Sequence, residues 1–381
     1  MVFTAPPCPV TVLPRLPPGP DPSSQPELVE ERMTILTDIV DVVIGVDTHV
    51  DTHTAAAVAA GTGAVLGQLT VTTTVDGYQD LVDFADEYSA LRVWAIEGTG
   101  GHGAGLTRQL ERREELVVEL DRPERAQRRH GAKSDPLDAV RAAREALSRK
   151  DVGTPRSGGD RQALSVLLAA RRSAVDASTV AQRQLFSLAV AAPEVLRDTL
   201  RGHKLPEMIC RAATVRLRKD WDTETITTAT VLKTLARRAR TLQAEADDLE
   251  KQIHVIVRRW RPDLLAQLGV GPIVAATVLC AWSHPGRIRS EAAFAMLAGV
   301  APIPANSGQV TTRYRLNRHG DRQLNRALHT VVLSRQRYDD ATKTYTARRT
   351  AQGKTPREIK RCLKRYIARD FYRLLEHPQA A

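Results

Sequence analysis

The sequence predicts an α/β plus α fold class: an α/β domain followed by a long, mainly helical region. Short β-rich runs are confined to residues 42–120, and helical periodicity dominates from about 161 onward. At 381 residues, 42% of them hydrophobic, the chain is longer than one core usually organises. We therefore divide it into four parts. Their boundaries are 1–38, 39–150, 151–260 and 261–381.

The first part has the composition of a disordered leader. Nine of the 21 prolines fall between Pro6 and Pro26, and this stretch has neither helical nor strand periodicity. We expect residues 1–38 to contribute nothing to the fold.

The second part alternates strands with helices. Strands are expected at 42–46, 54–60, 64–72, 91–96 and 116–120. Helices are expected at 75–88 and 104–113, and helical sequence follows the fifth strand up to about residue 150. The first three strands form a meander, with a tight turn at Gly61–Gly63. The order βββαβαβα is typical of the ribonuclease H-like fold, to which RuvC domains belong, rather than of a doubly wound βαβαβ sheet. In that fold the first and fourth strands are neighbours and the last helix packs across them.

The third part reads as a helical connector. Residues 151–160 have the composition of a linker, and 161–260 are rich in Ala, Leu and Arg with helical spacing. Pro193, Gly202 and Pro206 interrupt this spacing, so we expect at least two long helices, arranged as a coiled-coil-like arm. The last part, 261–381, is expected to be mainly helical and to end in a basic helix at 356–375.

Charge is distributed unevenly along the chain. Residues 1–100 carry three basic and 14 acidic side chains, whereas 261–381 carry 21 basic and eight acidic ones. The net charge of +11 therefore favours a polyanionic partner at the C-terminal end. The acidic N-terminal part would repel that partner unless its carboxylates bind cations. An Arg-rich genome composition is the alternative explanation for the basic excess.

Two functional classes are disfavoured by composition. The four cysteines are scattered without a CxxC pair, which argues against a zinc knuckle or a disulfide framework. No apolar run reaches the ~18 residues of a membrane span, and no hydrophobic signal segment opens the chain. We expect a soluble, cytoplasmic protein without a membrane partner.

Four acidic residues are candidates for one metal site. Asp47 and Glu97 end the first and fourth predicted strands, and Asp135 and Asp138 lie three residues apart at a predicted helix start. In a ribonuclease H-like sheet all four would converge. Clustered carboxylates suit Mg2+, and two ions about 4 Å apart would serve phosphoryl transfer, with Mn2+ as a possible substitute. The alternative is that they are solvated strand-end and helix-cap acids.

Two neighbouring motifs are less informative. We favour turn or supporting roles for His49 and His53 over direct metal ligation, because a sharp turn would scatter them. The stretch Gly98–Gly103 matches the GxGxxG pattern of dinucleotide sites. We reject that interpretation, because antiparallel strands precede it and Glu97 would face the pyrophosphate.

The last part contains two candidate nucleic-acid-binding elements. Gly269 and Gly271 begin a pattern like a helix-hairpin-helix, whose backbone amides can bind phosphate; an ordinary Gly-Pro helix start is the alternative. Ser307 follows in a predicted loop, and its local sequence alone favours an ordinary turn residue. Arginines that would neutralise phosphate surround this serine. They are Arg313, Arg315, Arg318, Arg322 and Arg326.

Together these motifs resemble the DEDD transposases of the insertion-sequence 110 family and are similar to pilin-gene invertases. The resemblance rests on five motifs in order, between residues 40 and 376. They are Gly45-Val-Asp-Thr-His-Val-Asp-Thr-His, Ile96-Glu-Gly-Thr-Gly, Lys133-Ser-Asp-Pro-Leu-Asp-Ala, Gly269-Val-Gly-Pro, and Asn306-Ser-Gly with the arginine-rich stretch after it. The proline-rich leader, and Gln309-Val-Thr-Thr after the serine, depart from the family pattern.

The resemblance implies a RuvC-like domain with a metal-binding acid tetrad, a helical connector used in oligomerisation and a C-terminal domain with Ser307 as the catalytic nucleophile. It also implies a bacterial, nucleoid-associated recombinase that acts as a dimer or tetramer. A structured non-coding bridge RNA would guide it to donor and target DNA. Two rival functions remain open: a RuvC-type endonuclease that hydrolyses DNA junctions with activated water, and a non-catalytic nucleic-acid-binding protein.

Overall fold

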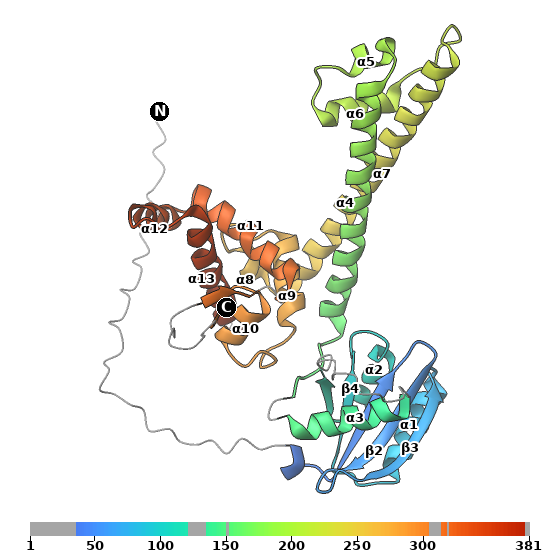
Figure 1. Ribbon diagram of the computed structural model, residues 1–381, viewed down its shortest axis with the longest axis vertical. Coiled ribbons are helices and arrows are strands. Elements are labelled where there is room, and N and C mark those ends of the chain that lie inside the picture. Colours follow the sequence, from blue (N-terminus) through green and yellow to red (C-terminus); the bar gives the residue numbers. More distant parts are fainter. Residues whose placement is uncertain (1–35, 121–134, 150–151, 305–313, 318–319, 378–381) are drawn as a thin grey trace, which may run out of the picture.

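A five-stranded sheet organises the N-terminal part of the computed structural model, which describes residues 36–120, 135–149, 152–304, 314–317 and 320–377 (Figure 1). Its strand order is β3-β2-β1-β4-β5. β1, β2 and β3 are antiparallel neighbours, and β4 pairs parallel with both β1 and β5. The predicted meander and the predicted pairing of the first and fourth strands are confirmed. The strands are β1 (Val42–Thr48), β2 (Thr52–Ala59), β3 (Val65–Thr72), β4 (Arg92–Glu97) and β5 (Val117–Leu120).

Helices cover both faces of this sheet. α1 (Val75–Asp86) and α2 (Ala104–Arg112) cover one face, and α3 (Asp135–Ser148) covers the other. Side chains of β1 alternate between these layers: Ile44 packs in the α1/α2 core and Val43 in the α3 core. Both cores are therefore anchored on β1, the strand on which the first predicted acid lies.

The connector consists of two long helices that run antiparallel. They are α4 (Gly159–Ala191) and α7 (Thr223–Trp260). Contacts between them pair low residue numbers with high ones: Arg171 forms an ion pair with Glu250 at 2.7 Å, and buried Ser178 donates to the Ala239 carbonyl. The seam is built largely from alanine, which lets the two helix backbones approach closely. The predicted pair of long helices is thus present, and it projects as an arm (Figure 1).

The interruption predicted around Pro193 and Gly202 occurs at the tip of this arm. Two short helices, α5 (Glu194–Leu200) and α6 (Leu205–Thr214), lie there between the long ones. They have their own small core, in which Leu196 and Leu200 pack with Leu232 of α7. The arm therefore ends in a folded knob.

The C-terminal body is mainly helical, as predicted. Its helices are α8 (Pro262–Leu265), α9 (Pro272–Trp282), α10 (Glu291–Leu297), α11 (Arg322–Tyr338), α12 (Asp340–Ala351) and α13 (Pro356–Glu376). A two-stranded ribbon, β6 (Pro302–Pro304) with β7 (Tyr314–Leu316), lies between α10 and α11 in the chain. The core of this body also takes in Leu164, Ile253 and Val257 from the base of the arm.

The body and the α/β domain touch beside the base of the arm. The Ser157 amide donates to Ser283 Oγ at 2.9 Å, and Arg287 lies 3.7 Å from Glu119 of β5. Residues predicted as linker contribute here, since Gly153 bridges to Glu119 and α4 already begins at Gly159. The four-part division of the chain stays a prediction, and residues 1–35 lie outside the described residues. The expected end of the leader is wrong, because Leu36–Asp38 form a 3-10 helix and Leu36 is buried in the core under α3. In the part of the chain described, none of the helices has the length and apolarity needed to cross a membrane.

Candidate active site

The four predicted acids lie at the ends of three elements of the α/β domain. Asp47 is the next-to-last residue of β1, and Glu97 is the last residue of β4. Asp135 and Asp138 both lie in the first turn of α3. Their side chains therefore belong to one edge of the sheet and to the helix that crosses it.

Strand alternation places Asp47 on the α3 face. Val43 lies in the core under α3, and Gly45, two residues on, is so close to α3 that an added Cβ would lie 2.2 Å from the Ala139 carbonyl oxygen. Asp47 continues this series and therefore points to the side from which Asp135 comes.

The same alternation places Glu97. Val93 and Ala95 of β4 lie in the core under α3, so Glu97, the next residue in the series, belongs to that face. The hydroxyl of Thr48 donates to the Glu97 carbonyl at 3.1 Å and fixes the two strand ends beside each other. The sequence analysis predicted that these two strand ends lie side by side. The metal-fitting group found among the described residues contains neither Glu97 nor Asp138, so the full tetrad stays a prediction.

The carboxylates of Asp135 and Asp138 lie near enough to Asp47 to act on it electrostatically. Burial raises the pKa of Asp47, and the nearby charges of Asp138 and Asp135 raise it further, while His49 opposes the increase. Asp138 also accepts from Arg141 at 2.7 Å. Like charges this close together repel, and a divalent cation bound among them removes that cost.

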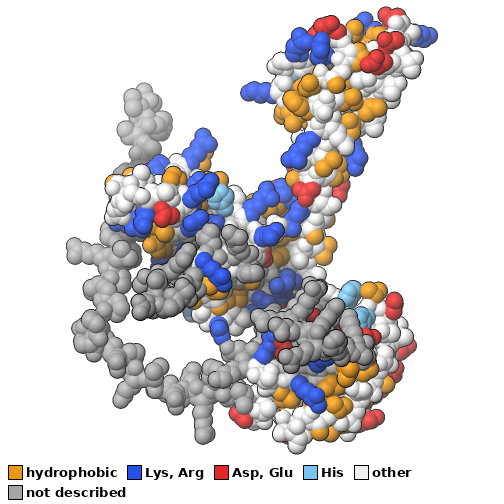
Figure 2. All heavy atoms as spheres, in the orientation of Figure 1, with side chains coloured by type: hydrophobic (Ala, Val, Ile, Leu, Met, Phe, Trp, Pro, Cys, Tyr) orange, Lys and Arg blue, Asp and Glu red, His pale blue; other side chains and the backbone are white. Residues whose placement is uncertain are grey.

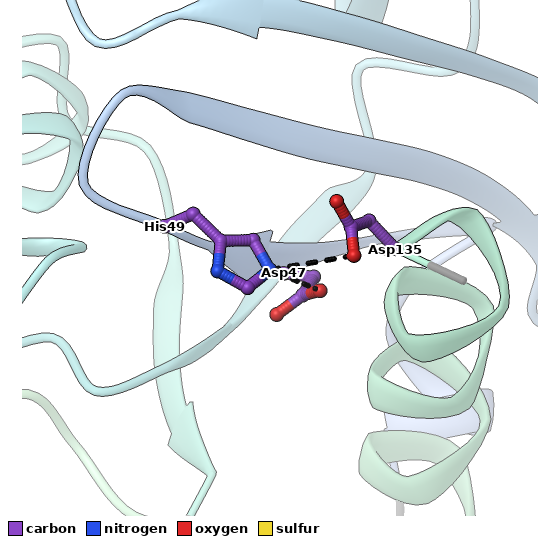
Figure 3. A group of neighbouring side chains, drawn as sticks. All are labelled: Asp47, His49 and Asp135. Carbon is purple, nitrogen blue, oxygen red and sulfur yellow. Dashed lines mark ion pairs between the residues drawn. The ribbon is translucent and has the colours of Figure 1, made fainter. Parts of the chain in front are cut away.

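One residue joins this group that the sequence did not favour. Nε2 of His49 lies 3.2 Å from Oδ2 of Asp47 and 3.4 Å from Oδ1 of Asp135 (Figure 3). The expected turn is present, because the His49 amide donates to the Thr52 carbonyl at 3.0 Å. A periodic pattern does not give the side-chain direction within such a turn, so only the close approach of α3 reveals this contact.

His53 lies on the other side of the sheet. It pairs with Thr48 across the hairpin, is fully buried and stacks on Tyr78 of α1, with ring centroids 5.7 Å apart. Burial lowers its pKa, which favours the neutral ring. The turn therefore separates the two histidines, as the sequence analysis anticipated.

This group fits a divalent metal. One ligand atom each from Asp47, His49 and Asp135 lies within 4.8 Å of the others. Carboxylate oxygens suit Mg2+ and Mn2+, and an imidazole nitrogen suits transition metals. Nε2 of His49 is buried and, among the described residues, makes no hydrogen bond of acceptable geometry.

The C-terminal candidates are only partly within the described residues. Ser307, Arg313 and Arg318 lie outside them, and Ser307 belongs to the segment that connects β6 to β7. Arg315 in β7 is exposed, and so are Arg322 and Arg326, which are four residues apart on α11. Figure 2 shows further Lys and Arg side chains along the arm and the helical body.

The two hairpin glycines differ in role. Gly269 has a φ of +84°, and an added Cβ would lie 2.8 Å from Cβ of Ser334 in α11. Both its conformation and its close contact with α11 therefore favour glycine at position 269. Gly271 caps the start of α9 and has open space around its Cα. The predicted phosphate-binding role of both glycines stays a prediction.

Fold and site together define a class: an α/β domain with a metal-fitting acidic cluster at its sheet edge, joined by an arm to a basic helical body. Comparison with known families identifies the family within this class. A transposase model of the DEDD type of IS110 matches residues 44–190, and a model described as transposase IS116/IS110/IS902 family matches 263–347. The matches together take in more than half of the chain, which belongs to the IS110/IS116/IS902 transposase family.

Two curated relatives agree with this assignment. The chain is 33% identical over 129 residues to the insertion element IS900 uncharacterized 42 kDa protein of Mycobacterium paratuberculosis, and 31% identical over 127 residues to the insertion element IS110 uncharacterized 43.6 kDa protein of Streptomyces coelicolor. Each alignment covers 33% of this chain. It covers 32% of the first relative and 31% of the second, so the chain spans about a third of the length of each.

Proposed function

We propose that this protein is a transposase that cuts and rejoins DNA at the ends of an insertion sequence. The observation that carries the proposal is the meeting of Asp47, Asp135 and His49 at the end of β1, in a chain matched by DEDD transposase models. The basic helical body supports the choice of DNA as substrate, because 21 Lys and Arg side chains follow residue 260.

The acids act as a metal-binding tetrad in a RuvC-like domain. Asp47, Glu97, Asp135 and Asp138 hold divalent cations, Mg2+ with Mn2+ as a substitute. When bound there, two such ions would supply activation of the attacking oxygen and stabilisation of the leaving oxygen in a phosphoryl transfer. The strand order and the position of α3 across β1 support this role, because they direct acids from distant parts of the sequence to one sheet edge.

Ser307 is the nucleophile. Its hydroxyl oxygen forms a bond to phosphorus, the bond from phosphorus to a DNA oxygen breaks, and the released DNA hydroxyl takes up a proton. The phosphoserine ester conserves the energy of the broken bond, so a second DNA hydroxyl can reverse the step and release the serine. Exposed Arg315, Arg322 and Arg326 are suited to neutralise the phosphate.

The family resemblance adds two partners. We propose that a structured bridge RNA pairs with donor and target DNA, and that the active form is a dimer or tetramer. In that assembly the serine of one subunit meets the acids of another.

The test is denaturing electrophoresis of labelled DNA after incubation with the full-length protein, guide RNA and Mg2+. Wild-type protein should form a covalent protein–DNA adduct. Asp47→Asn and Glu97→Gln should abolish cleavage, and Ser307→Ala should abolish the adduct while retaining DNA binding. Asp80→Asn is the matched control, because Asp80 is exposed on α1, on the opposite face of the sheet.

Two outcomes would replace the proposal. Cleavage by wild-type protein without any adduct would establish the hydrolytic, RuvC-type endonuclease. DNA binding without cleavage, unchanged by Asp47→Asn, would establish a non-catalytic nucleic-acid-binding protein.

A further inference from the structure

The imidazole of His49 lies between two carboxylates that come from distant parts of the sequence. Asp47 is two residues away in β1, but Asp135 is 86 positions further along, at the start of α3. Nε2 of His49 is within 3.4 Å of an oxygen of each. Figure 3 shows the ring nitrogen directed toward the space between the two acids.

These contacts have the spacing of neighbouring ligands on one ion. In octahedral coordination with metal–ligand distances of about 2.1 Å, adjacent ligand atoms are about 3 Å apart. The two contacts of Nε2 are 3.2 and 3.4 Å long. Both are ion-pair contacts, and Nε2, which is buried from solvent, does not meet strict hydrogen-bond geometry with any described residue. Atoms that are close but not aligned for hydrogen bonding fit a shared third partner.

The backbone around His49 is held in place. Its amide donates to the Thr52 carbonyl, which closes the β1–β2 turn. The turn is tied to the end of β3 as well: the Thr73 hydroxyl donates to the Val50 carbonyl at 2.9 Å, and the Thr73 amide donates to the Asp51 carbonyl at 3.0 Å. This preorganisation reduces the entropy that ordering the ring would cost.

We propose that His49 Nε2 is a direct ligand of the metal held by Asp47 and Asp135. This inference rests on the proposed metal site and reverses the sequence expectation of a turn or supporting role for His49. A nitrogen ligand changes the metal preference of the site, because Mg2+ strongly favours oxygen ligands whereas transition metals accept imidazole. The site should therefore bind Mn2+ more tightly than Mg2+.

Pulsed electron paramagnetic resonance of the full-length protein loaded with Mn2+ tests this directly. The wild-type spectrum should contain the nitrogen-14 coupling of a bound imidazole. His49→Gln should lose that coupling and weaken Mn2+ binding about tenfold or more, with a smaller effect on Mg2+. His254→Gln, at an exposed position on α7, should retain both the coupling and the affinity.

Aspartate at the same position gives a second variant. His49→Asp replaces nitrogen by oxygen and should shift the preference toward Mg2+. Nitrogen coupling that persists in His49→Gln, or wild-type Mn2+ without coupling, would overturn the inference. If Mn2+ binding still depends on Asp47 in that case, the proposed acidic site stands without His49. Binding that is equally strong in Asp47→Asn would overturn both.

Discussion

Asp47 shows how far a single residue can be placed from sequence. Its position at a strand end follows from the β-rich run before it, and strand alternation gives its face once α3 is known to cross β1. His49, two residues later, could not be placed in this way. Its ring direction depends on a turn closed by Thr52 and on the approach of α3, which are both tertiary facts.

Gly269 is a second residue whose role depends on tertiary structure. Its pattern predicts a phosphate-binding turn, which stays a prediction, and the structure adds that its left-handed conformation lies against Ser334, 65 positions away. No local pattern encodes that neighbour. The part of the site that sequence could not predict is therefore the part determined by contacts between distant elements.

Cys280 provides a prediction at the residue scale. Burial raises the pKa of this thiol to about 11, so only about one molecule in 1,000 carries the thiolate at pH 8. Iodoacetamide should therefore label exposed Cys210 much faster than Cys280, as measured by mass spectrometry of the digested protein. Unfolding in guanidinium chloride should remove the difference. Equal labelling rates in the folded protein would contradict the expected burial.

At the scale of elements, hydrophobic periodicity predicted the five strands of the sheet, the two helices between them and the last helix to within about two residues of their observed ends. The difference lies mainly at the termini: β2 begins at Thr52 rather than Thr54, because cross-strand pairing with β3 extends to Thr72. The sequence did not predict that the two long helices of the connector pack antiparallel against each other. The antiparallel pairing of α4 with α7 depends on alanines such as Ala181 and Ala239 in the seam, which look unremarkable in sequence.

Gly45 carries a prediction about the contact between α3 and the sheet. In Gly45→Ala the new methyl would lie 2.2 Å from the Ala139 carbonyl oxygen and 2.5 Å from the Ala143 amide nitrogen. Overpacking of this kind costs about 1–3 kcal/mol and displaces the start of α3. Thermal unfolding should therefore occur at lower temperature, and Mn2+ affinity should fall as Asp135 moves.

Gly61→Ala is the control for that experiment. An added Cβ at Gly61 meets no atom within 4 Å, and its φ is not in the left-handed region. Its unfolding temperature and metal affinity should match those of the wild type. A Gly45→Ala protein that behaved like Gly61→Ala would show that α3 does not pack as described.

The end of α4, beside the knob, carries a prediction about self-association. Phe186 and Val190, four residues apart on α4, are 51% and 59% exposed. Replacing both by Asp should shift sedimentation toward the monomer, because burying them against a second copy would then require burying charge. Val75→Asp, at an exposed apolar position of the α/β domain, should leave the sedimentation coefficient unchanged. Unchanged sedimentation of the double variant would place the contact elsewhere.

At the scale of the whole molecule, charge separates the two ends of the chain, and this was readable from sequence alone. The C-terminal body should supply much of the electrostatic affinity for DNA. Replacing Arg315, Arg322 and Arg326 together by Gln should weaken binding and reduce the slope of log affinity against log salt by up to about 3, since each phosphate contact contributes about 0.9. Fluorescence anisotropy at several salt concentrations measures this slope.

The control for the salt experiment removes the same charge elsewhere. Arg108, Arg112 and Arg113 are exposed on or beside α2, within the acidic end of the molecule. Their replacement by Gln should change the slope much less. An equal reduction in both triple variants would mean that DNA contacts the two ends alike.

The position of the base of the arm determines how movement of the arm reaches the rest of the molecule. Leu164 of α4 and Ile253 and Val257 of α7 belong to the same core as α9, so the arm begins inside the C-terminal body rather than on its surface. A helix of 33 residues is about 50 Å long, so the arm extends far from the core in which its base is anchored. A small tilt imposed at the knob, by a second subunit or by nucleic acid, would turn α9 and the Ser157–Ser283 contact with it. Assembly at the tip of the arm would thus change the position of the α/β domain relative to the body.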